Sequence, residues 1–200
     1  MYDWIELIVI IWTCLLFAGT NKAYTHEANA YPALSKFQGK EIPKYYGSYT
    51  LNFPTHSHRQ GVVRMILIEH IEGDTMVDFQ PEDIPQSMRK EIMKSIVDIE
   101  SQIYEKDLLL SDLEPRNVVL TPSTAETNHP RTVLIDFGDV LFNRTRDGPL
   151  ALKIENFLGQ YISPLLRWKE HWQKLCPFEE WFAHTAASIT EEMRERWSDD

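Results

Sequence analysis

Apolar residues recur with helical spacing in one long segment, residues 86–104. They lie three or four positions apart and so share one face of an α-helix, while most of the charged residues fall on the other faces. The stripe consists of Met88, Ile92, Ile96, Ile99 and Ile103. Packing against a core explains this pattern fully, so the segment predicts a helix with that face buried.

Three apolar segments have the short length and the β-branched content of buried strands: residues 62–68, 118–120 and 132–135. A fourth segment, residues 42–51, is rich in tyrosine and predicts a strand with a bend at Gly47. The sequence therefore predicts several short strands, two of them after the long helix.

Polar segments separate these elements. Residues 51–61 contain proline, glycine and histidine, and residues 121–131 are rich in threonine and proline, so both predict solvated loops. His56 and His58 have a spacing that could bind a metal ion. No third ligand lies near them in sequence, so ordinary loop histidines are the favoured interpretation.

Further helices are predicted on both sides of these strands. In residues 26–37, Ala30, Leu34 and Phe37 share helical spacing, and Gly39 marks the expected end. The last quarter of the chain also predicts helices, interrupted by prolines. The resulting order is a helix, strands, a long helix, two short strands and a helical tail, which predicts an α+β fold.

The segment from Leu7 to Ala18 is an almost uninterrupted apolar run of 12 residues. As a helix it is too short to span a bilayer, which takes about 20 apolar residues. It follows acidic rather than basic residues, unlike the core of a signal peptide. We favour a buried strand or helix of the fold. The alternatives are a membrane-directing segment and an N-terminus that does not represent the native start.

Composition narrows the class of protein. With 43% hydrophobic and 25% charged residues, the 200-residue chain is typical of one globular domain, or one domain in two lobes. Its 30 acidic and 20 basic residues give a formal charge of −10, which disfavours general nucleic-acid binding because that depends on Lys and Arg. The two cysteines lie far apart in sequence, which excludes a disulfide framework and suits a reducing compartment.

Three polar residues have the spacing of a catalytic site. Asp112 and Asn117 lie in a short segment between the long helix and a strand, and Asp136 directly follows the next strand as part of Asp-Phe-Gly. Phosphoryl transfer from ATP needs one carboxylate aimed at an acceptor hydroxyl and hard oxygen ligands for Mg²⁺. The structural alternative is an Asx-rich turn followed by a strand-ending aspartate.

With these residues in view, the segment from Glu27 to about residue 142 resembles the protein-kinase-like superfamily. The closer resemblance is to fungal kinase-like proteins, through the segments IP-x-x-x-G, ILIE-x-IEG and D-x-x-PRN. It implies a bilobal α+β fold with a truncated β-rich N-lobe, a mainly helical C-lobe and ATP between them. The chain then divides into an apolar segment of uncertain status (1–26), a partial N-lobe and hinge (27–74) and a C-lobe (75–200).

The resemblance also implies roles in catalysis and metal binding. Asp112 is similar to the catalytic-loop aspartate that orients or deprotonates the acceptor hydroxyl. Asn117 and Asp136 match the two Mg²⁺ ligands of the superfamily. The implied cofactors are therefore ATP and Mg²⁺.

Four more residues gain roles in nucleotide binding by the same resemblance. Ile68 occupies the gatekeeper position, and Glu69 and Ile71 belong to a hinge whose backbone groups bind adenine. Glu27 is similar to the helix glutamate that pairs with a strand lysine. The alternatives are core packing for the two isoleucines and a solvated helix surface for Glu27.

The chain departs from the superfamily in the groups that bind phosphate. It contains no G-x-G sequence, and the only lysine or arginine before Glu27 is Lys22, too close in sequence to lie on a separate strand facing it. Glu114 stands where a lysine is common, and its carboxylate would repel a γ-phosphate. Arg116 would partly compensate if it pointed inward.

We therefore expect an ATP- and Mg²⁺-dependent phosphotransferase that transfers the γ-phosphate to a hydroxyl of a protein or small molecule. The alternative is a pseudokinase that works through protein contacts, because the sequence lacks the glycine-rich loop and the strand lysine. A cytoplasmic location is the expectation, and membrane association through residues 7–18 is its alternative. The sequence does not identify the acceptor.

Overall fold

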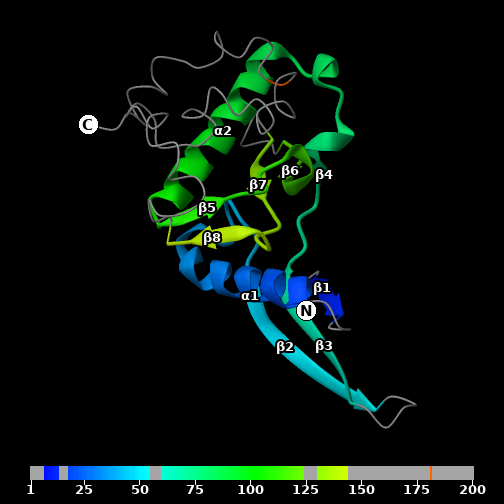
Figure 1. The fold of residues 1–200 in the computed structure, drawn as a ribbon. Coiled ribbons are helices and arrows are strands. Elements are labelled where there is room, and N and C mark those ends of the chain that lie inside the picture. Colours follow the sequence, from blue (N-terminus) through cyan, green and yellow to red (C-terminus); the bar gives the residue numbers. More distant parts are fainter. Residues whose placement is uncertain (1–6, 14–17, 55–59, 124–129, 144–180, 182–200) are drawn as a thin grey trace, which may run out of the picture.

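Short apolar segments pair as strands around two helical segments in the computed structural model, which describes residues 7–13, 18–54, 60–123, 130–143 and Trp181. Across these ranges the fold mixes two α-helices with small antiparallel sheets (Figure 1). This confirms the α+β class. The predicted helical tail lies outside the described residues, except for Trp181, which is helical and buried.

The apolar N-terminal run contributes a strand, as one of the sequence interpretations proposed. Strand β1 (Leu7–Thr13) pairs antiparallel with β3 (Gln60–Glu69) along its whole length, and β2 (Tyr45–Pro54) pairs with the other edge of β3. The sheet order is therefore β1-β3-β2. No lysine lies on β1, which has the sequence LIVIIWT.

Strands β2 and β3 form a long hairpin that projects from the rest of the fold (Figure 1). The predicted bend is present, because the register shifts between Tyr45 and Gly47. The predicted loop at residues 51–61 is wrong at both ends, since β2 continues to Pro54 and β3 already begins at Gln60. Backbone pairing holds these residues in strands, and the polarity of the segment alone did not reveal this. His56 and His58 lie outside the described residues.

Helix α1 (Ala18–Ala33) begins and ends earlier than the predicted helix at residues 26–37. Its first turns carry no apolar periodicity, so the pattern could not show them. It ends just after Pro32, which lacks a backbone N–H, and the chain tightens into a 3₁₀ turn at η1 (Ser35–Phe37). Ala30, Leu34 and Phe37 are nevertheless buried, as their spacing indicated.

Helix α2 spans Gln86–Tyr104, the range that the apolar stripe predicted, and its isoleucines are buried in the core. It is followed by β5 (Leu108–Leu110), which pairs with β8 (Val140–Phe142) in a two-stranded sheet that the sequence analysis missed. Two further 3₁₀ turns, η2 (Met76–Asp78) and η3 (Pro81–Asp83), directly precede α2.

A third sheet has the order β4-β6-β7. The predicted strands at residues 118–120 and 132–135 form its β6 (Val118–Leu120) and β7 (Thr132–Leu134). They pair antiparallel with each other, and the two-residue β4 (Asp74–Thr75) adds to the free edge of β6. The 3₁₀ turn η4 (Pro115–Asn117) directly precedes β6 and brings the candidate site residues to this sheet.

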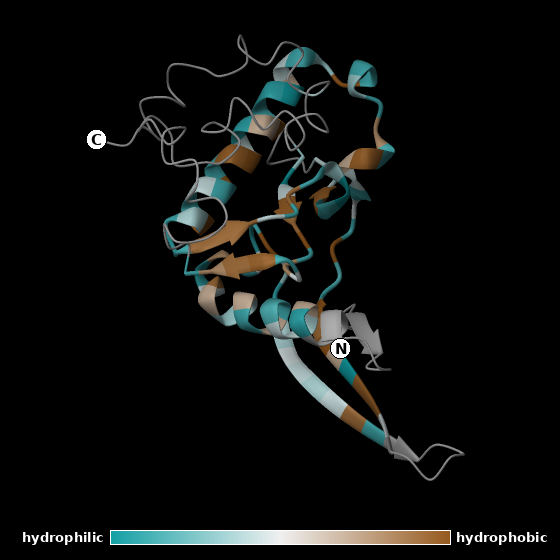
Figure 2. Cartoon of the chain, in the orientation of Figure 1, coloured by the Kyte–Doolittle hydropathy of each residue, from teal (hydrophilic) through white to brown (hydrophobic). Residues whose placement is uncertain are grey.

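One apolar cluster joins nearly all of these elements. It contains Tyr31 from α1, Ile66 from β3, Ile96 from α2 and Phe137 from the turn after β7. The apolar ribbon segments that meet between α2 and α1 in Figure 2 belong to this region. In the part of the chain that the structure describes, neither α-helix is long and apolar enough to cross a membrane.

Candidate active site

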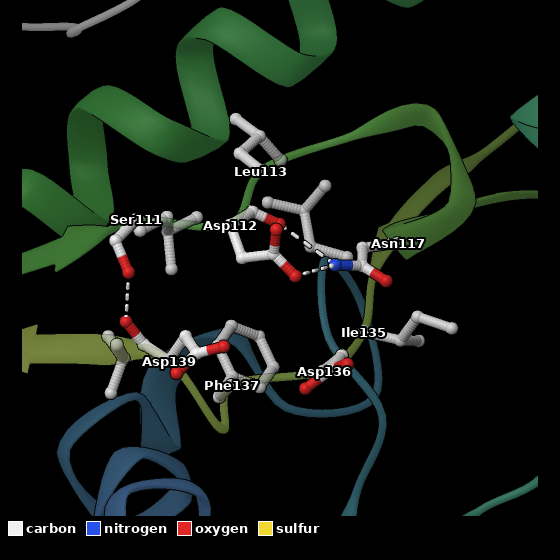
Figure 3. Close-up of a pocket in the computed structure, with 11 residues that line it drawn as sticks. Ser111, Asp112, Leu113, Asn117, Ile135, Asp136, Phe137 and Asp139 are labelled. Carbon is white, nitrogen blue, oxygen red and sulfur yellow. Dashed lines mark hydrogen bonds between the residues drawn. The ribbon is translucent and has the colours of Figure 1, made fainter. Parts of the chain in front are cut away.

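A small pocket lies where the segment after β5 meets the end of β7 (Figure 3). Its cavity volume is about 10 Å³, which is roughly the space needed by one water molecule. Asp112, Asn117 and Asp136 all line it, together with Asp139 and apolar residues of β5 and β7. Two segments separated in sequence thus bring the three predicted residues to one pocket.

Backbone geometry fixes the two sides of this pocket relative to each other. Pro115 begins η4, and the N–H of Asn117 donates to the carbonyl of Glu114 at 2.8 Å to close the turn. The carbonyl of Asn117 in turn accepts the N–H of Ile135 at 2.9 Å. Because Ile135 immediately precedes Asp136, this bond sets the position of Asp136 opposite the turn.

The Asn117 side chain is buried, with 5% of its surface exposed, and its orientation is determined by two bonds. Its Nδ2 donates to the Asp112 carbonyl at 2.8 Å and to the Asp112 carboxylate at 3.2 Å. Figure 3 shows the amide nitrogen facing Asp112 and the amide oxygen on the opposite side. The amide oxygen is therefore directed away from Asp112 and remains an acceptor.

Asp136 adopts a left-handed backbone conformation, with φ of 63°. Few residues other than glycine do so, and aspartate is among them because its short carboxylate can bond to the local backbone. Here the N–H of Gly138 donates to Asp136 Oδ1 at 3.1 Å. The next residue, Phe137, is buried and anchors this turn in the core, while Asp136 stays at the pocket.

Arg116 contacts Asp112, which lines the pocket, and so binds two carboxylates of its own segment. Its guanidinium contacts both oxygens of Asp112, at 2.9 and 3.0 Å, and it also pairs with Glu114. The hydrogen bond and the charge of Asp112, and to a smaller extent the charge of Glu114, raise the pKa of Arg116. The arginine therefore already neutralises the acidic residue that the sequence analysis identified as unfavourable for phosphate.

The residues that the resemblance assigned to nucleotide binding do not line this pocket. Ile68 is buried in the main core, and Ile71 packs with Val119 in a smaller cluster, so core packing describes both. Glu69 ties β3 to the segment before β2: its N–H donates to the Lys44 carbonyl at 2.8 Å, and its carboxylate accepts the Lys44 N–H at 2.9 Å.

Glu27 is 1% exposed on α1, so the solvated-surface alternative for this residue is wrong. The carboxylate of Glu27 therefore lies inside the fold and not on its surface. It also influences a neighbouring tyrosine that the sequence analysis missed, Tyr31, one helical turn further along the same face.

Tyr31 connects α1 to the turn that carries Asp136. Its ring is stacked on Tyr45 with centroids 5.1 Å apart, and it meets Phe137 edge-on at 5.4 Å. Burial, followed by the charges of Glu27 and Asp136, raises the pKa of Tyr31 well above the ordinary value of 10.0. The signal available in the sequence was its four-residue spacing from Glu27.

The donor set of the pocket fits a hard cation such as Mg²⁺. Carboxylate and amide oxygens are typical ligands, and Mg²⁺ in proteins is usually held by one or two carboxylates together with phosphate oxygens and water. Within the described ranges no three His, Cys, Asp or Glu side chains gather into a complete metal site. A cation here would therefore use Asn117 and Asp136 and complete its shell with ligands from outside the protein.

Comparison with protein families and with curated proteins gives no match. No family model matches the chain, and no curated protein is similar to it beyond the level expected by chance. The residues of the pocket are therefore the basis for assigning a function.

Proposed function

We propose that the chain is a kinase-like phosphotransferase that uses ATP and Mg²⁺ to phosphorylate a hydroxyl group of a protein or small molecule. The observation that carries this proposal is the meeting of Asp112, Asn117 and Asp136 at one pocket. Their carboxylate and amide groups are those that phosphoryl transfer requires.

Each side chain has a distinct task in this proposal. The Asp112 carboxylate would accept the proton of the acceptor hydroxyl, and the Nδ2 bond from Asn117 holds it in orientation. The oxygens of Asn117 and Asp136 would hold Mg²⁺, which when bound neutralises charge on the phosphates. The bond from Gly138 to Asp136 limits rotation of that carboxylate and so keeps it preorganised.

The proposed architecture is a bilobal kinase-like fold. The sheet β1-β3-β2 and helix α1 would form a reduced N-lobe, and α2 with the short sheets would begin the C-lobe. The packing of Tyr31 on Phe137 supports this arrangement because it couples α1 to the turn of Asp136, and the burial of Glu27 on the same helix is consistent with it.

One observation favours a second candidate, a kinase-like binding module without catalysis. Arg116 binds both Asp112 oxygens, so in the conformation seen here the carboxylate is occupied by the arginine and not presented to an acceptor hydroxyl. The lack of lysine on β1 points in the same direction. This module would work through protein contacts and would bind nucleotide weakly or not at all.

Calorimetric titration of Mg²⁺-ATP into the wild-type chain and Asp136→Asn tests the proposal. We expect binding by the wild type and at least about tenfold weaker binding by the variant, since a charged metal ligand is lost. The matched control is Asp83→Asn, which makes the same charge change at an exposed residue of η3 and should bind as the wild type does.

Turnover separates the two candidates. Release of ADP by the wild type, abolished in Asp112→Asn, supports a phosphotransferase. Binding of Mg²⁺-ATP without turnover supports the module. Equal affinity of the wild type and Asp136→Asn would refute the proposed metal site.

A further inference from the structure

The described residues that line the pocket carry negative charge, which disfavours a polyphosphate ligand. Asp112, Asp136 and Asp139 line it, and Glu114 follows Asp112 by two residues. Among the described residues that line the pocket there is no lysine or arginine. A triphosphate bound at the mouth of this pocket would meet carboxylates at short range, and one divalent cation would offset only part of that repulsion.

Arg116 is the cation placed to balance this charge. It lies on η4, one residue before Asn117, and 55% of its side chain is exposed. Both of its partners, Asp112 and Glu114, belong to the same short segment, so the guanidinium can leave them by rotating about its own side-chain bonds. No backbone movement is required.

The other arginines of the described part of the chain are engaged elsewhere. Arg64 lies 5.1 Å above the ring of Tyr24, Arg89 donates to the Ile84 carbonyl at 2.9 Å, and Arg131 donates to the Gly39 carbonyl at 3.2 Å. Of these side chains, only Arg116 contacts a residue that lines the pocket.

We propose that Arg116 binds the terminal phosphate of the nucleotide, and that in the conformation seen here it instead closes the site by holding Asp112. This inference rests on the proposed function. A terminal phosphate would compete with Asp112 and Glu114 for the guanidinium, whose planar fork binds phosphate as well as carboxylate. The transfer of Arg116 would release the Asp112 carboxylate from the arginine while the bond from Asn117 still orients it, so nucleotide binding and activation of the base would be one event.

Glu114 gains a specific role in this scheme. It holds the guanidinium in the closed conformation alongside Asp112, and so opposes its transfer to phosphate. Removing the negative charge of Glu114 should therefore strengthen nucleotide binding, whereas removing the positive charge of Arg116 should weaken it. If the ion pair were purely structural, both variants would be less stable, and neither would bind nucleotide more or less strongly for a reason of charge.

The test compares the affinities of Mg²⁺-ATP and Mg²⁺-ADP by calorimetry, in the wild type, Arg116→Gln, Arg116→Lys and Glu114→Gln. The wild type should prefer ATP. Arg116→Gln should bind ATP about tenfold more weakly with little change for ADP, Arg116→Lys should lie between them, and Glu114→Gln should prefer ATP more strongly than the wild type does. Lys90→Gln, the same charge change on the exposed side of α2, is the control and should leave the ratio unchanged.

The outcomes separate this inference from the proposed function. If the wild type binds Mg²⁺-ATP but Arg116→Gln keeps the wild-type ratio of ATP to ADP affinity, the role of Arg116 is refuted and the proposed function stands. If the wild type binds neither nucleotide, both are refuted. Thermal unfolding of every variant shows whether a change in ratio comes from a folded protein.

Discussion

At the scale of single residues, Asn117 holds the candidate site together. Its side chain donates twice to Asp112, and its backbone carbonyl accepts the N–H of Ile135. Asn117→Ala keeps the backbone bond but leaves the partly buried Asp112 carbonyl without its side-chain donor. We expect a loss of about 1–3 kcal/mol in the free energy of unfolding, measured by urea denaturation.

The control for this prediction is Asn52→Ala, an exposed asparagine of β2. Its unfolding free energy should stay within about 0.5 kcal/mol of the wild type, as is usual at exposed positions. Equal stability of Asn117→Ala and the wild type would show that the bonds to Asp112 contribute nothing to the folded state.

Tyr31 carries a prediction about alkaline pH. Burial, with the charges of Glu27 and Asp136, raises the pKa of Tyr31 in the folded state above the value of 10.0 expected for the unfolded chain. Its stabilising contribution is complete below pH 10.0 and is lost as the pH rises from there towards the folded pKa, because only the unfolded chain releases the proton. In Tyr31→Phe this alkaline loss should be smaller.

Tyr31→Phe should also be close to the wild type in stability at pH 7. The ring contacts with Tyr45 and Phe137 remain, and the hydroxyl that is removed has no hydrogen-bond partner among the described residues. Urea denaturation at pH 7 and at several values above pH 10 measures both effects. The same alkaline loss in the two proteins would contradict the buried, neutral state of Tyr31.

At the scale of elements, the features that were predicted correctly are those set by local sequence. Helix α2 was predicted over its full range because its apolar stripe alone determines which face is buried. Strand β5 was missed because three leucines have no period of their own, and pairing with the distant β8 decides their conformation. The first turns of α1 were missed for a similar reason, since they have no apolar pattern.

The candidate site also has some features that could be predicted from local sequence and others that depend on the folded chain. The spacing of Asp112, Asn117 and Asp136 was visible in the sequence because the chemistry needs those groups on one loop and one strand end. The partners of Arg116 were not visible, because an arginine in sequence carries no information about which carboxylate its side chain will meet. Tyr31 was missed because an aromatic residue on a helix is ordinarily part of the core. Its raised pKa depends on its burial and on the charges of Glu27 and Asp136, which become neighbours only in the folded chain.

Two glycines, Gly73 and Gly39, lie in connections between elements and have positive φ angles. At Gly73, before β4, φ is 158° and an added Cβ would come within 2.5 Å of the Leu120 carbonyl oxygen. At Gly39, φ is 74° and the nearest atom to such a Cβ, at 2.8 Å, belongs to the flexible Lys44 side chain. The obstacle is backbone in the first case and a movable side chain in the second.

We therefore expect Gly73→Ala to be more destabilising than Gly39→Ala. The second substitution should cost about 1–2 kcal/mol, the usual cost of a left-handed conformation for alanine. The first should cost more than that, because β4 and β6 must also separate for the new methyl group to fit. Urea denaturation of both variants provides the comparison, and the reverse order would contradict the close approach of Gly73 to Leu120.

At the scale of the whole molecule, the candidate site lies where α1 meets the short sheets. Phe137 follows Asp136 directly and packs on Tyr31 of α1, while α1 also contacts β3 and β8. Since a single apolar cluster includes these residues, the geometry of the pocket depends on helix α1 as well as on the segments that line it. Any change in the position of α1 would be transmitted to Asp136 through two aromatic rings.

The continuity of this cluster predicts that the described elements unfold together. Ile66 on β3 and Ile103 on α2 are both fully buried in it, far apart in sequence. Replacing either with alanine should cost about 2–5 kcal/mol. If the cluster is one cooperative unit, each substitution should shift the whole transition to lower urea concentration, with tryptophan fluorescence and far-UV circular dichroism changing at the same midpoint. Two separate transitions, with Ile66→Ala moving one and Ile103→Ala the other, would show two independent units, and coupling between α1 and the site would then require another explanation.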